Sequence, residues 1–480
     1  MRVTFIGHAA LLIETRGITI LSDPWWGHPC FAAQWWNFPR ALGHLAEDRK
    51  LDYIYISHRH HDHLHPGTLA KLNRPAKVLV AAGGDLAAAA AECGFEAIEI
   101  GQDEERDLGQ GVRCRIMRTH SDDSLMVVSD GEEVCVNLND ALHSAPADVQ
   151  ARFVARLRQL YPTIDYAFCG YGVASHFPNC YRIPGKNREA TAAARQRYFN
   201  GQWAGLMASL APRFALPFAA DVVFLDDQLF WVNEPTHNAE RPLAALARMS
   251  PQFEGQAFDI APGFAIERGK VVAAIERTPL SAEQLRTDMA QEIVKANRYN
   301  KADRDTVAAL EQLLAQNIER CRAYLESYPD DYSMLVRFPG VAPGISIRKQ
   351  GRSIATAVVD DANAVSADLS FTARAQYLRA SLTRKYGNET LFVGSGCMFD
   401  YPNRRQAERN LQRELMVMVR EHEVPPAPPR VPGPLAQVRK VVKRVLLGPA
   451  PTDLYDLGTW TTWQEAGSEN EPPGRPASTA

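Results

Sequence analysis

The sequence lacks the features that would place it in several common classes of protein. No run of about 18 apolar residues occurs, which argues against a transmembrane helix. The eight cysteines form no CxxC pair, as is typical of free thiols in a reducing compartment. Because 53 Lys and Arg are balanced by 56 Asp and Glu, no global positive charge would recruit nucleic acid. With no cleavable secretory signal in the first residues, we expect a cytoplasmic protein that binds no nucleic acid.

Two common catalytic motifs are also missing. The sequence contains no G-x-S-x-G, the nucleophile turn of many serine hydrolases, and no G-x-x-x-x-G-K-[ST], the loop that binds nucleotide phosphates. The sequence therefore gives no motif-based evidence for a serine nucleophile or for a nucleotide-phosphate loop.

The overall composition is typical of a folded chain with several domains. Its 480 residues, 46% of them hydrophobic, suffice for roughly two to four domains. Short β-rich runs open the chain, and residues 52–57 form a predicted strand that ends in a histidine-rich segment. Longer helices are predicted at 148–160, 188–210 and 281–325, and short strands return between 333 and 371. Two sheets flanked by helices, followed by a smaller α+β region, fit this order.

The histidine-rich segment carries the strongest functional signal. Residues 57–65 read S-H-R-H-H-D-H-L-H, in which His58, His60, Asp62 and His63 form an H-x-H-x-D-H frame. Imidazole and carboxylate are ligands of zinc, iron and manganese, and a loop that leaves a strand can direct several of them at one point. The first two histidines can bind one ion, and Asp62 with His63 can reach a second ion. The alternative is a solvated histidine-rich surface loop.

Two later residues can complete such a site. His120 lies between two predicted strands and is positioned like a second ligand loop, although it could equally be an ordinary surface or core histidine. Asp140 ends the strand-like run V-C-V-N-L-N-D, and its carboxylate could bridge two ions. The alternative for Asp140 is a turn or helix-cap aspartate.

The complete spacing resembles the metallo-β-lactamase superfamily. His120 follows His63 by 57 residues, and Asp140 follows after 20 more. The resemblance implies a four-layer αβ/βα sandwich of the α/β class, with the metal site at one edge. The small C-terminal α+β domain is predicted separately, from the strand and helix pattern beyond residue 329. It also implies the distribution of ligands: His58, His60 and His120 on the first ion, Asp62 and His63 on the second, and Asp140 between them.

Three further segments are similar to the lactamase-like part of CMP-N-acetylneuraminate hydroxylases. They are D-P-W-W-G-H-P-C-F-A-A-Q-W-W (residues 23–36), I-S-H-R-H-H-D-H-L (56–64) and L-P-F-A-A-D (216–221), and the similarity continues to about Glu421. Those hydroxylases carry a Rieske iron–sulfur domain, which needs C-x-H and C-x-x-H ligand pairs, and the sequence has neither pair. Sialic acid hydroxylation is therefore not transferred, because the electrons would have to come from another protein.

For several other residues near the predicted metal site, the sequence leaves more than one role possible. Asp23 resembles the strand-end aspartate that holds the ligand loop in this superfamily, or it is an ordinary Asp-Pro turn. The last ligand of the second ion has no clear counterpart, and the candidates are Asp221, Asp226 and His237, of which Asp226 is nearest the expected place. His65 and His176 could contact substrate or line the site. Trp25, Trp26, Trp35 and Trp36 are expected to pack in the core rather than to stack a ligand.

The predicted domains follow from these segments. Residues 1–260 form the metal domain, 261–328 a helical connector and 329–423 a small α+β domain. Residues 424–434 contain six prolines and are predicted to be a linker, and 435–480 a basic helix with a disordered tail. The basic segment 435–447 could contact an anionic membrane at its periphery.

The first functional hypothesis is a metal-dependent hydrolase acting on a small-molecule ester, amide, lactone or phosphodiester. One or two divalent ions would activate water, with zinc expected and iron or manganese as alternatives, and the catalytic residues would be Asp62 and Asp140. A second hypothesis is an iron-dependent oxygenase acting on a sugar or nucleotide-sugar with an external electron donor. A third is a non-catalytic scaffold at the membrane periphery. The oligomeric state is not specified by the sequence.

Overall fold

The predicted N-terminal strands are confirmed, and they are part of a larger sheet. Strands β1 (Arg2–Gly7), β2 (Ala10–Thr15) and β3 (Ile18–Ser22) pair antiparallel. Most of their side chains are buried on both faces, as expected for strands that are covered from both sides. The sheet continues on one edge with β5 (Tyr53–Tyr55), β6 (Lys77–Ala81) and β7 (Ala97–Ile100), and on the other with β18 (Ala265–Glu267) and β19 (Lys270–Ala273).

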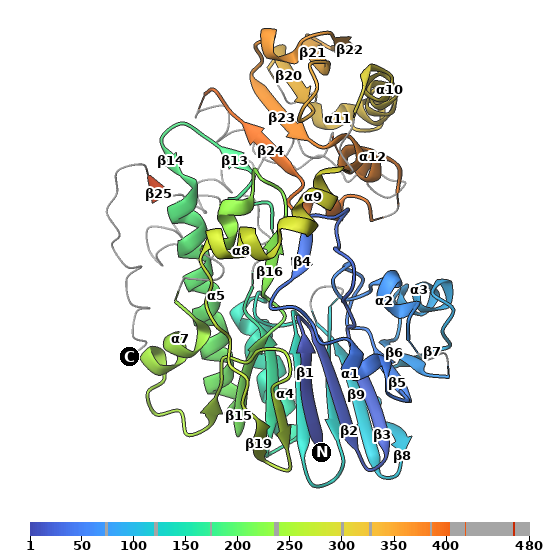
Figure 1. Ribbon diagram of the computed structural model, residues 1–480, viewed down its shortest axis with the longest axis vertical. Coiled ribbons are helices and arrows are strands. Elements are labelled where there is room, and N and C mark those ends of the chain that lie inside the picture. Colours follow the sequence, from blue (N-terminus) through green and yellow to red (C-terminus); the bar gives the residue numbers. More distant parts are fainter. Residues whose placement is uncertain are drawn as a thin grey trace, which may run out of the picture. The chain divides into compact units, whose positions relative to one another are not determined.

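A second sheet of seven strands faces the first one (Figure 1). Its order is β17 (Gln256–Ala257), β15 (Phe214–Phe218), β12 (Tyr166–Gly170), β11 (Val134–Asn139), β10 (Ser124–Ser129), β9 (Val112–Arg118) and β8 (Arg106–Gly109). Side chains of both sheets form one hydrophobic cluster, in which Phe5 and Tyr55 of the first sheet join Met126 and Phe168 of the second. The main core of this part of the chain therefore lies between the sheets.

Helices cover the outer face of each sheet. The eight-stranded sheet packs against α1 (His44–Glu47), α2 (Pro66–Leu69) and α3 (Leu86–Glu92). The seven-stranded sheet packs against α4 (Ala147–Leu160), α5 (Arg188–Leu210) and α7 (Pro242–Met249). This is the predicted four-layer αβ/βα sandwich, in which each sheet buries one face against the other sheet and one face under helices.

Short elements complete this first unit. Strand β4 (Trp35–Asn37) pairs with β16 (Val222–Phe224), and a small cluster holds η1 (Phe230–Val232), α8 (Ala282–Asp288) and α9 (Ala290–Arg298). Helix α13 (Glu389–Phe392) also belongs to the first unit, although it is distant from the rest of that unit in the sequence.

The second unit is built around a six-stranded sheet. Its order is β13 (Tyr181–Arg182), β24 (Cys397–Asp400), β23 (Leu369–Ala373), β20 (Asp331–Arg337), β21 (Gly344–Gln350) and β22 (Ser353–Val359). The unit also holds α10 (Arg304–Arg320), α11 (Arg322–Leu325), η2 (Ala362–Ala364), α12 (Ala375–Thr383) and the pair β14 (Lys186–Asn187) with β25 (Gln464–Glu465). The predicted small α+β region is thus present.

The computed structural model describes residues 1–403, 418 and 464–465, apart from 73–74, 120–122, 173–174, 235–239, 299–301, 326–328 and 385. The described chain forms two compact units that interleave in sequence: 1–175, 193–300 and 389–395 in the first, and 176–192, 301–388 and 396 onward in the second. The sequence predicts instead that each domain is one uninterrupted range of residues. The predicted linker 424–434 and the basic segment 435–447 lie outside the described residues.

Two further findings concern the cysteines and the hydropathy of the helices. All eight cysteines are free thiols. Among the residues that the structure describes, no helix combines the length and the apolar character needed to span a bilayer.

Removal of a large side chain from between the sheets should destabilise the first unit. Phe168 is 1% exposed, and its ring packs edge-to-face with Phe218 at a centroid distance of 5.6 Å. We expect Phe168→Ala to lower the free energy of unfolding by about 3–5 kcal/mol, because it leaves a cavity in a close-packed core. Urea unfolding followed by tryptophan fluorescence measures the loss. Val272→Ala, at a side chain that is 50% exposed, should change it by less than about 0.5 kcal/mol.

Candidate metal centre

The ends of several strands meet at one edge of the sandwich. His8 follows β1, Asp23 follows β3, and the histidine-rich segment follows β5. β1, β3 and β5 run in the same direction, so their C-terminal ends lie at the same edge of the first sheet. Asn139 and Asp140 come from the end of β11 in the second sheet, and Asn139 Nδ2 donates a hydrogen bond of 2.5 Å to Asp23 Oδ2. Both sheets therefore contribute to one site.

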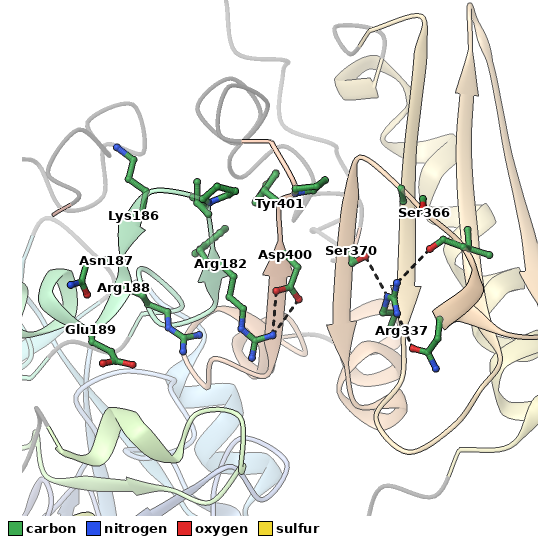
Figure 2. Close-up of a pocket in the computed structure, with 17 residues that line it drawn as sticks. Arg182, Lys186, Asn187, Arg188, Glu189, Arg337, Ser366, Ser370, Asp400 and Tyr401 are labelled. Carbon is green, nitrogen blue, oxygen red and sulfur yellow. Dashed lines mark hydrogen bonds and ion pairs between the residues drawn. The ribbon is translucent and has the colours of Figure 1, made fainter. Parts of the chain in front are cut away.

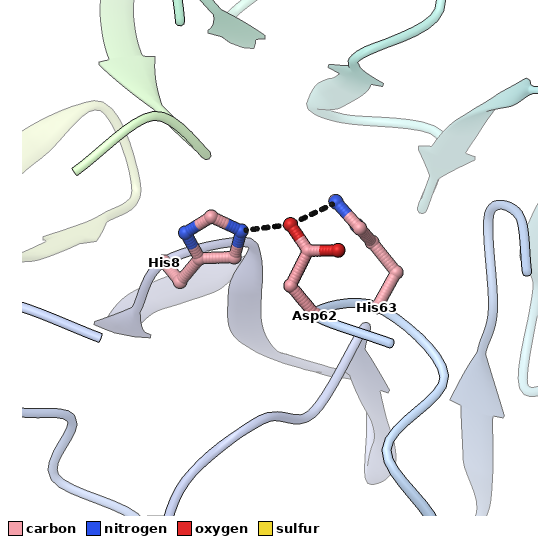
Figure 3. Close-up of side chains that lie close together, drawn as sticks. All are labelled: His8, Asp62 and His63. Carbon is pink, nitrogen blue, oxygen red and sulfur yellow. Dashed lines mark hydrogen bonds and ion pairs between the residues drawn. The ribbon is translucent and has the colours of Figure 1, made fainter. Parts of the chain in front are cut away.

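Three buried side chains form the first group of candidate metal ligands. The Nε2 atom of His8 lies 3.1 Å from Asp62 Oδ2, and His63 Nε2 lies 3.4 Å from the same oxygen (Figure 3). The exposed fractions of His8, Asp62 and His63 are at most 6%. One donor atom from each residue lies within 4.8 Å of the other two, so the three could hold one cation.

A second group shares His63 with the first. His63 Nε2 is 3.4 Å from Asp140 Oδ2, and His58 completes a set whose donor atoms also lie within 4.8 Å of one another. His60 is adjacent, because its Nδ1 atom is 2.8 Å from His58 Nε2. The two candidate donor groups therefore overlap at His63, whose Nε2 atom can bind one ion.

Buried atoms without hydrogen bonds show that this donor set suits a cation. His8 Nδ1, Asp62 Oδ1, His63 Nε2 and Asp140 Oδ1 are all buried and make no hydrogen bond among the described residues. A buried polar atom without a partner costs about 1–3 kcal/mol, so such atoms rarely gather unless they bind a ligand or an ion. Imidazole nitrogens and carboxylate oxygens, with no sulfur, are the donors expected for zinc, iron or manganese.

Asp23 holds the histidine-rich loop in position through contacts with Ser57 and His63. It is fully buried, and its Oδ1 atom accepts a 2.8 Å hydrogen bond from the backbone N–H of Ser57. Its Oδ2 atom lies 3.4 Å from His63 Nδ1. The first residue of the loop and one of its histidines are thus held by the same carboxylate, which is the supporting contact that the resemblance implies.

Three residues of the site have positive φ angles, which are uncommon for residues other than glycine. The φ angles are 50° at His8, 35° at Asp23 and 48° at Asn139. The left-handed region costs energy for these residues and persists only where the surrounding contacts impose it. Each follows directly on a strand or ends one, so the strained turn redirects the side chain at the edge of the sheet.

The charges of the site stabilise one another. Burial acts to raise the pKa of Asp62, but the charge of the adjacent His63 and the contact with His8 hold this pKa well below its usual value. Burial likewise opposes a charge on His63, yet Asp62 and Asp140 hold the pKa of His63 well above its usual value. The carboxylates therefore favour a positive charge between them, and a metal ion would compete with the proton of His63.

His60 behaves differently from His63. Burial and the neighbouring His58 lower the pKa of His60 to about 4. Its imidazole is therefore neutral at pH 7, the form that a metal ligand requires. The structure thus brings together five of the six predicted ligands, His58, His60, Asp62, His63 and Asp140, whereas His120 lies outside the described residues.

Two of the three candidates for the last ligand have other partners in the described chain. Asp221 forms ion pairs with Arg241 at 3.3 Å and with Arg277 at 3.2 Å, so its charge is already neutralised. Asp226 Oδ1 accepts a hydrogen bond from the backbone N–H of Gln228 at 2.9 Å, as in a turn. His237 lies outside the described residues. His8 instead lies beside Asp62 and His63, at a place that the sequence interpretation overlooked.

The remaining candidate histidines and the tryptophans are placed as follows. His65 is the N-cap of α2, where its ring accepts a 3.1 Å hydrogen bond from the backbone N–H of Thr68. His176 belongs to the second unit. The four tryptophans mostly pack in the core as expected, with Trp25 fully buried and its ring edge-to-face with His8 at 5.0 Å.

Glu389 is a second residue that the sequence interpretation missed. Its side chain is 6% exposed, and its Oε2 atom makes no hydrogen bond among the described residues. The segment is held to the first unit by Gln34, whose Nε2 atom donates to the backbone oxygen of Thr390 at 2.8 Å. Burial, and then the charge of Asp62, raise the pKa of Glu389 to about 8. An isolated glutamate so far along the chain carries no sequence signal that connects it to the histidine segment.

The chain is similar to known proteins in this region. Residues 2–149 match the family model of the Beta-lactamase superfamily domain. A Mycobacterium tuberculosis protein named as a Rieske 2Fe-2S iron-sulfur protein is 28% identical over 303 residues, which cover 59% of this chain and 57% of that protein. The cytidine monophosphate-N-acetylneuraminic acid hydroxylase of Asterias rubens is 40% identical over 78 residues, 15% of this chain and 12% of that enzyme. The solved structure of Igni18, a metallo hydrolase of Ignicoccus hospitalis, is 16% identical with a TM-score of 0.38, covering 55% of this chain and 97% of that one.

These similarities confirm the resemblance to the metallo-β-lactamase superfamily over residues 2–149, and in part the resemblance to the hydroxylases. The matches to the curated relatives cover only part of those proteins. The chain spans about half the length of the mycobacterial proteins that it matches, at 57% and 46%.

The raised pKa of Glu389 should make stability depend on pH. Between the ordinary glutamate pKa of about 4.5 and the folded value of about 8, the unfolded chain loses this proton while the folded chain keeps it. Stability is therefore lost as the pH rises through this window, by at most about 1.4 kcal/mol per pH unit from this group. We expect Glu389→Gln to flatten the decline for chelator-treated protein, as measured by the melting temperature at pH 5, 6.5 and 8. Parallel curves for the two proteins would contradict the assignment; Glu283→Gln, at an exposed position, is the control.

Proposed function

We propose that the first unit is the catalytic part of a metal-dependent hydrolase. The observation that carries this proposal is the pair of adjacent donor groups that share His63. His58, His60 and Asp140 would hold one divalent cation, and His8, Asp62 and His63 the other, with His120 proposed as a further ligand. When bound, such cations polarise a carbonyl or phosphoryl oxygen and lower the pKa of water to about 7.

The protein's own groups would handle the proton and the orientation. Asp62 keeps its negative charge at neutral pH because His63 and His8 stabilise the carboxylate. Its Oδ2 atom is engaged by His8 at 3.1 Å, which leaves Oδ1 to orient a water molecule and accept its proton. Asp140 Oδ1 is similarly available on the other side of His63. Asp23 and Asn139 keep these groups in place through the loop.

An iron-dependent oxygenase is the second candidate. The observation that favours it is the similarity to a protein named for a Rieske centre, which extends over 303 residues, whereas the family model covers only residues 2–149. The same nitrogen and oxygen donors suit iron. Such an enzyme would act on a sugar or nucleotide-sugar with electrons from a separate donor. A cytoplasmic location and a small-molecule substrate are predictions common to both candidates.

Metal content should depend on the shared histidine. We expect His63→Ala to lose most of its bound metal, because both donor groups contain this residue. Elemental analysis of purified protein gives the metal-to-protein ratio. His44→Ala removes an exposed histidine of α1 and should retain the metal of the parent protein. An unchanged ratio in His63→Ala protein that remains folded by circular dichroism would refute the site.

Product analysis distinguishes the hydrolase from the oxygenase. We expect the zinc- or manganese-loaded protein to hydrolyse an ester, lactone or phosphodiester from a substrate panel, and Asp62→Asn to lower kcat by about 10²–10⁴-fold. Dioxygen consumption by iron-loaded protein with a chemical reductant, coupled to hydroxylation and without hydrolysis in any metal form, would favour the oxygenase and reject the hydrolase.

A further inference from the structure

The second unit contains a large pocket of its own. Its volume is about 880 Å³, within the range of small-molecule sites, and it is lined by 17 residues of this unit (Figure 2). Strands β13 and β24 supply one part of the lining, and the segment 363–370 with Arg337 supplies another. All of these residues are described, and none belongs to the metal centre.

The pocket has an excess of positively charged residues, although the chain as a whole carries a small net negative charge. Four of the lining residues are basic, namely Arg182, Lys186, Arg188 and Arg337, and two are acidic. The complete chain has 53 basic and 56 acidic residues, so this local excess is opposite to the overall balance. A concave surface with an excess of one charge focuses the field on a ligand of opposite sign.

Arg337 is held in position by neutral groups. Its Nη1 atom donates to Asn363 Oδ1 at 2.9 Å, Nε donates to Ser370 Oγ at 3.3 Å, and Nη2 lies 3.5 Å from the backbone oxygen of Val365. These acceptors fix the guanidinium plane but do not neutralise its charge. A preorganised guanidinium of this kind is well suited to a planar or bidentate contact with an oxyanion.

The cations of β13 and α5 lie close enough to affect one another. Arg182 Nη1 is 3.2 Å from Asp400 Oδ1, so one carboxylate of the pocket already pairs with one of the four cations (Figure 2). Burial and the charge of Arg182 lower the pKa of Arg188, which means that the field at this guanidinium disfavours positive charge. A bound anion would relieve this repulsion.

We propose that this pocket binds a small organic molecule that carries a phosphate group. Phosphate offers three terminal oxygens, and the lining supplies the guanidinium of Arg337 and the hydroxyls of Ser366 and Ser370 as donors, while Arg182 adds positive charge in another part of the pocket. The apolar side chains of Ile183, Pro184 and Val365 provide surface for the organic part of such a ligand. The proposal is independent of the hydrolase proposal, because it concerns binding to the second unit.

Calorimetric titration of the full chain with adenosine 5′-monophosphate tests the pocket. We expect measurable binding of this phosphate monoester, no binding of adenosine, and weaker binding of inorganic phosphate. Arg337→Gln should weaken the affinity by about tenfold or more, as expected for the loss of a charged hydrogen-bond donor. Asp400→Asn should strengthen it, because Arg182 is then no longer neutralised by this carboxylate.

Matched variants keep the test decisive. Arg348→Gln removes the same charge from an exposed position of β21 outside the pocket and should leave the affinity unchanged. If Arg337→Gln were destabilised, the opposite effect of Asp400→Asn would still identify the site. The proposal is overturned if the parent protein binds none of the phosphates at millimolar concentration, or if the affinity is the same in Arg337→Gln, Asp400→Asn and Arg348→Gln.

Discussion

The buried carboxylate of Asp23 is the contact on which the geometry of the candidate metal centre depends. It accepts hydrogen bonds from the backbone of Ser57 and from the side chain of Asn139, and it lies beside His63. These partners come from the ends of β5 and β11, in two different sheets. One fully buried carboxyl group therefore joins the two halves of the sandwich where the candidate ligands gather. Burial of this polar group is tolerated because each of its oxygens accepts a hydrogen bond.

The same physics explains why the site can hold cations. Asp62, Asp140 and the neighbouring imidazoles are buried at the edge of a close-packed core, and several of their atoms have no hydrogen-bond partner in the described chain. Positive φ angles at His8, Asp23 and Asn139 add conformational cost. Desolvated charges, orphaned donor atoms and strained turns all oppose folding when taken alone, and they cluster where binding or catalysis compensates for them.

The two units are not independent stretches of sequence. The segment 389–395 returns to the first unit after the chain has built most of the second one, and it carries the buried Glu389. The first unit in turn is interrupted by residues 176–192, which supply β13 and part of the lining of the pocket of about 880 Å³. Each unit is therefore completed by residues that lie far from its main segment in the sequence.

The sequence alone determined the architecture and most of the candidate ligands. Short β-rich runs bounded by glycines predicted the early strands, and the H-x-H-x-D-H frame placed four potential ligands on one loop, because these signals are local. The resemblance carried by that frame implied the sandwich. Only the tertiary structure revealed that His8 lies with Asp62, that Asp221 is engaged by Arg241 and Arg277, and that Glu389 is buried in the same unit. Burial and charge pairing between residues tens to hundreds of positions apart depend on how the sheets pack, and no short sequence pattern encodes that packing.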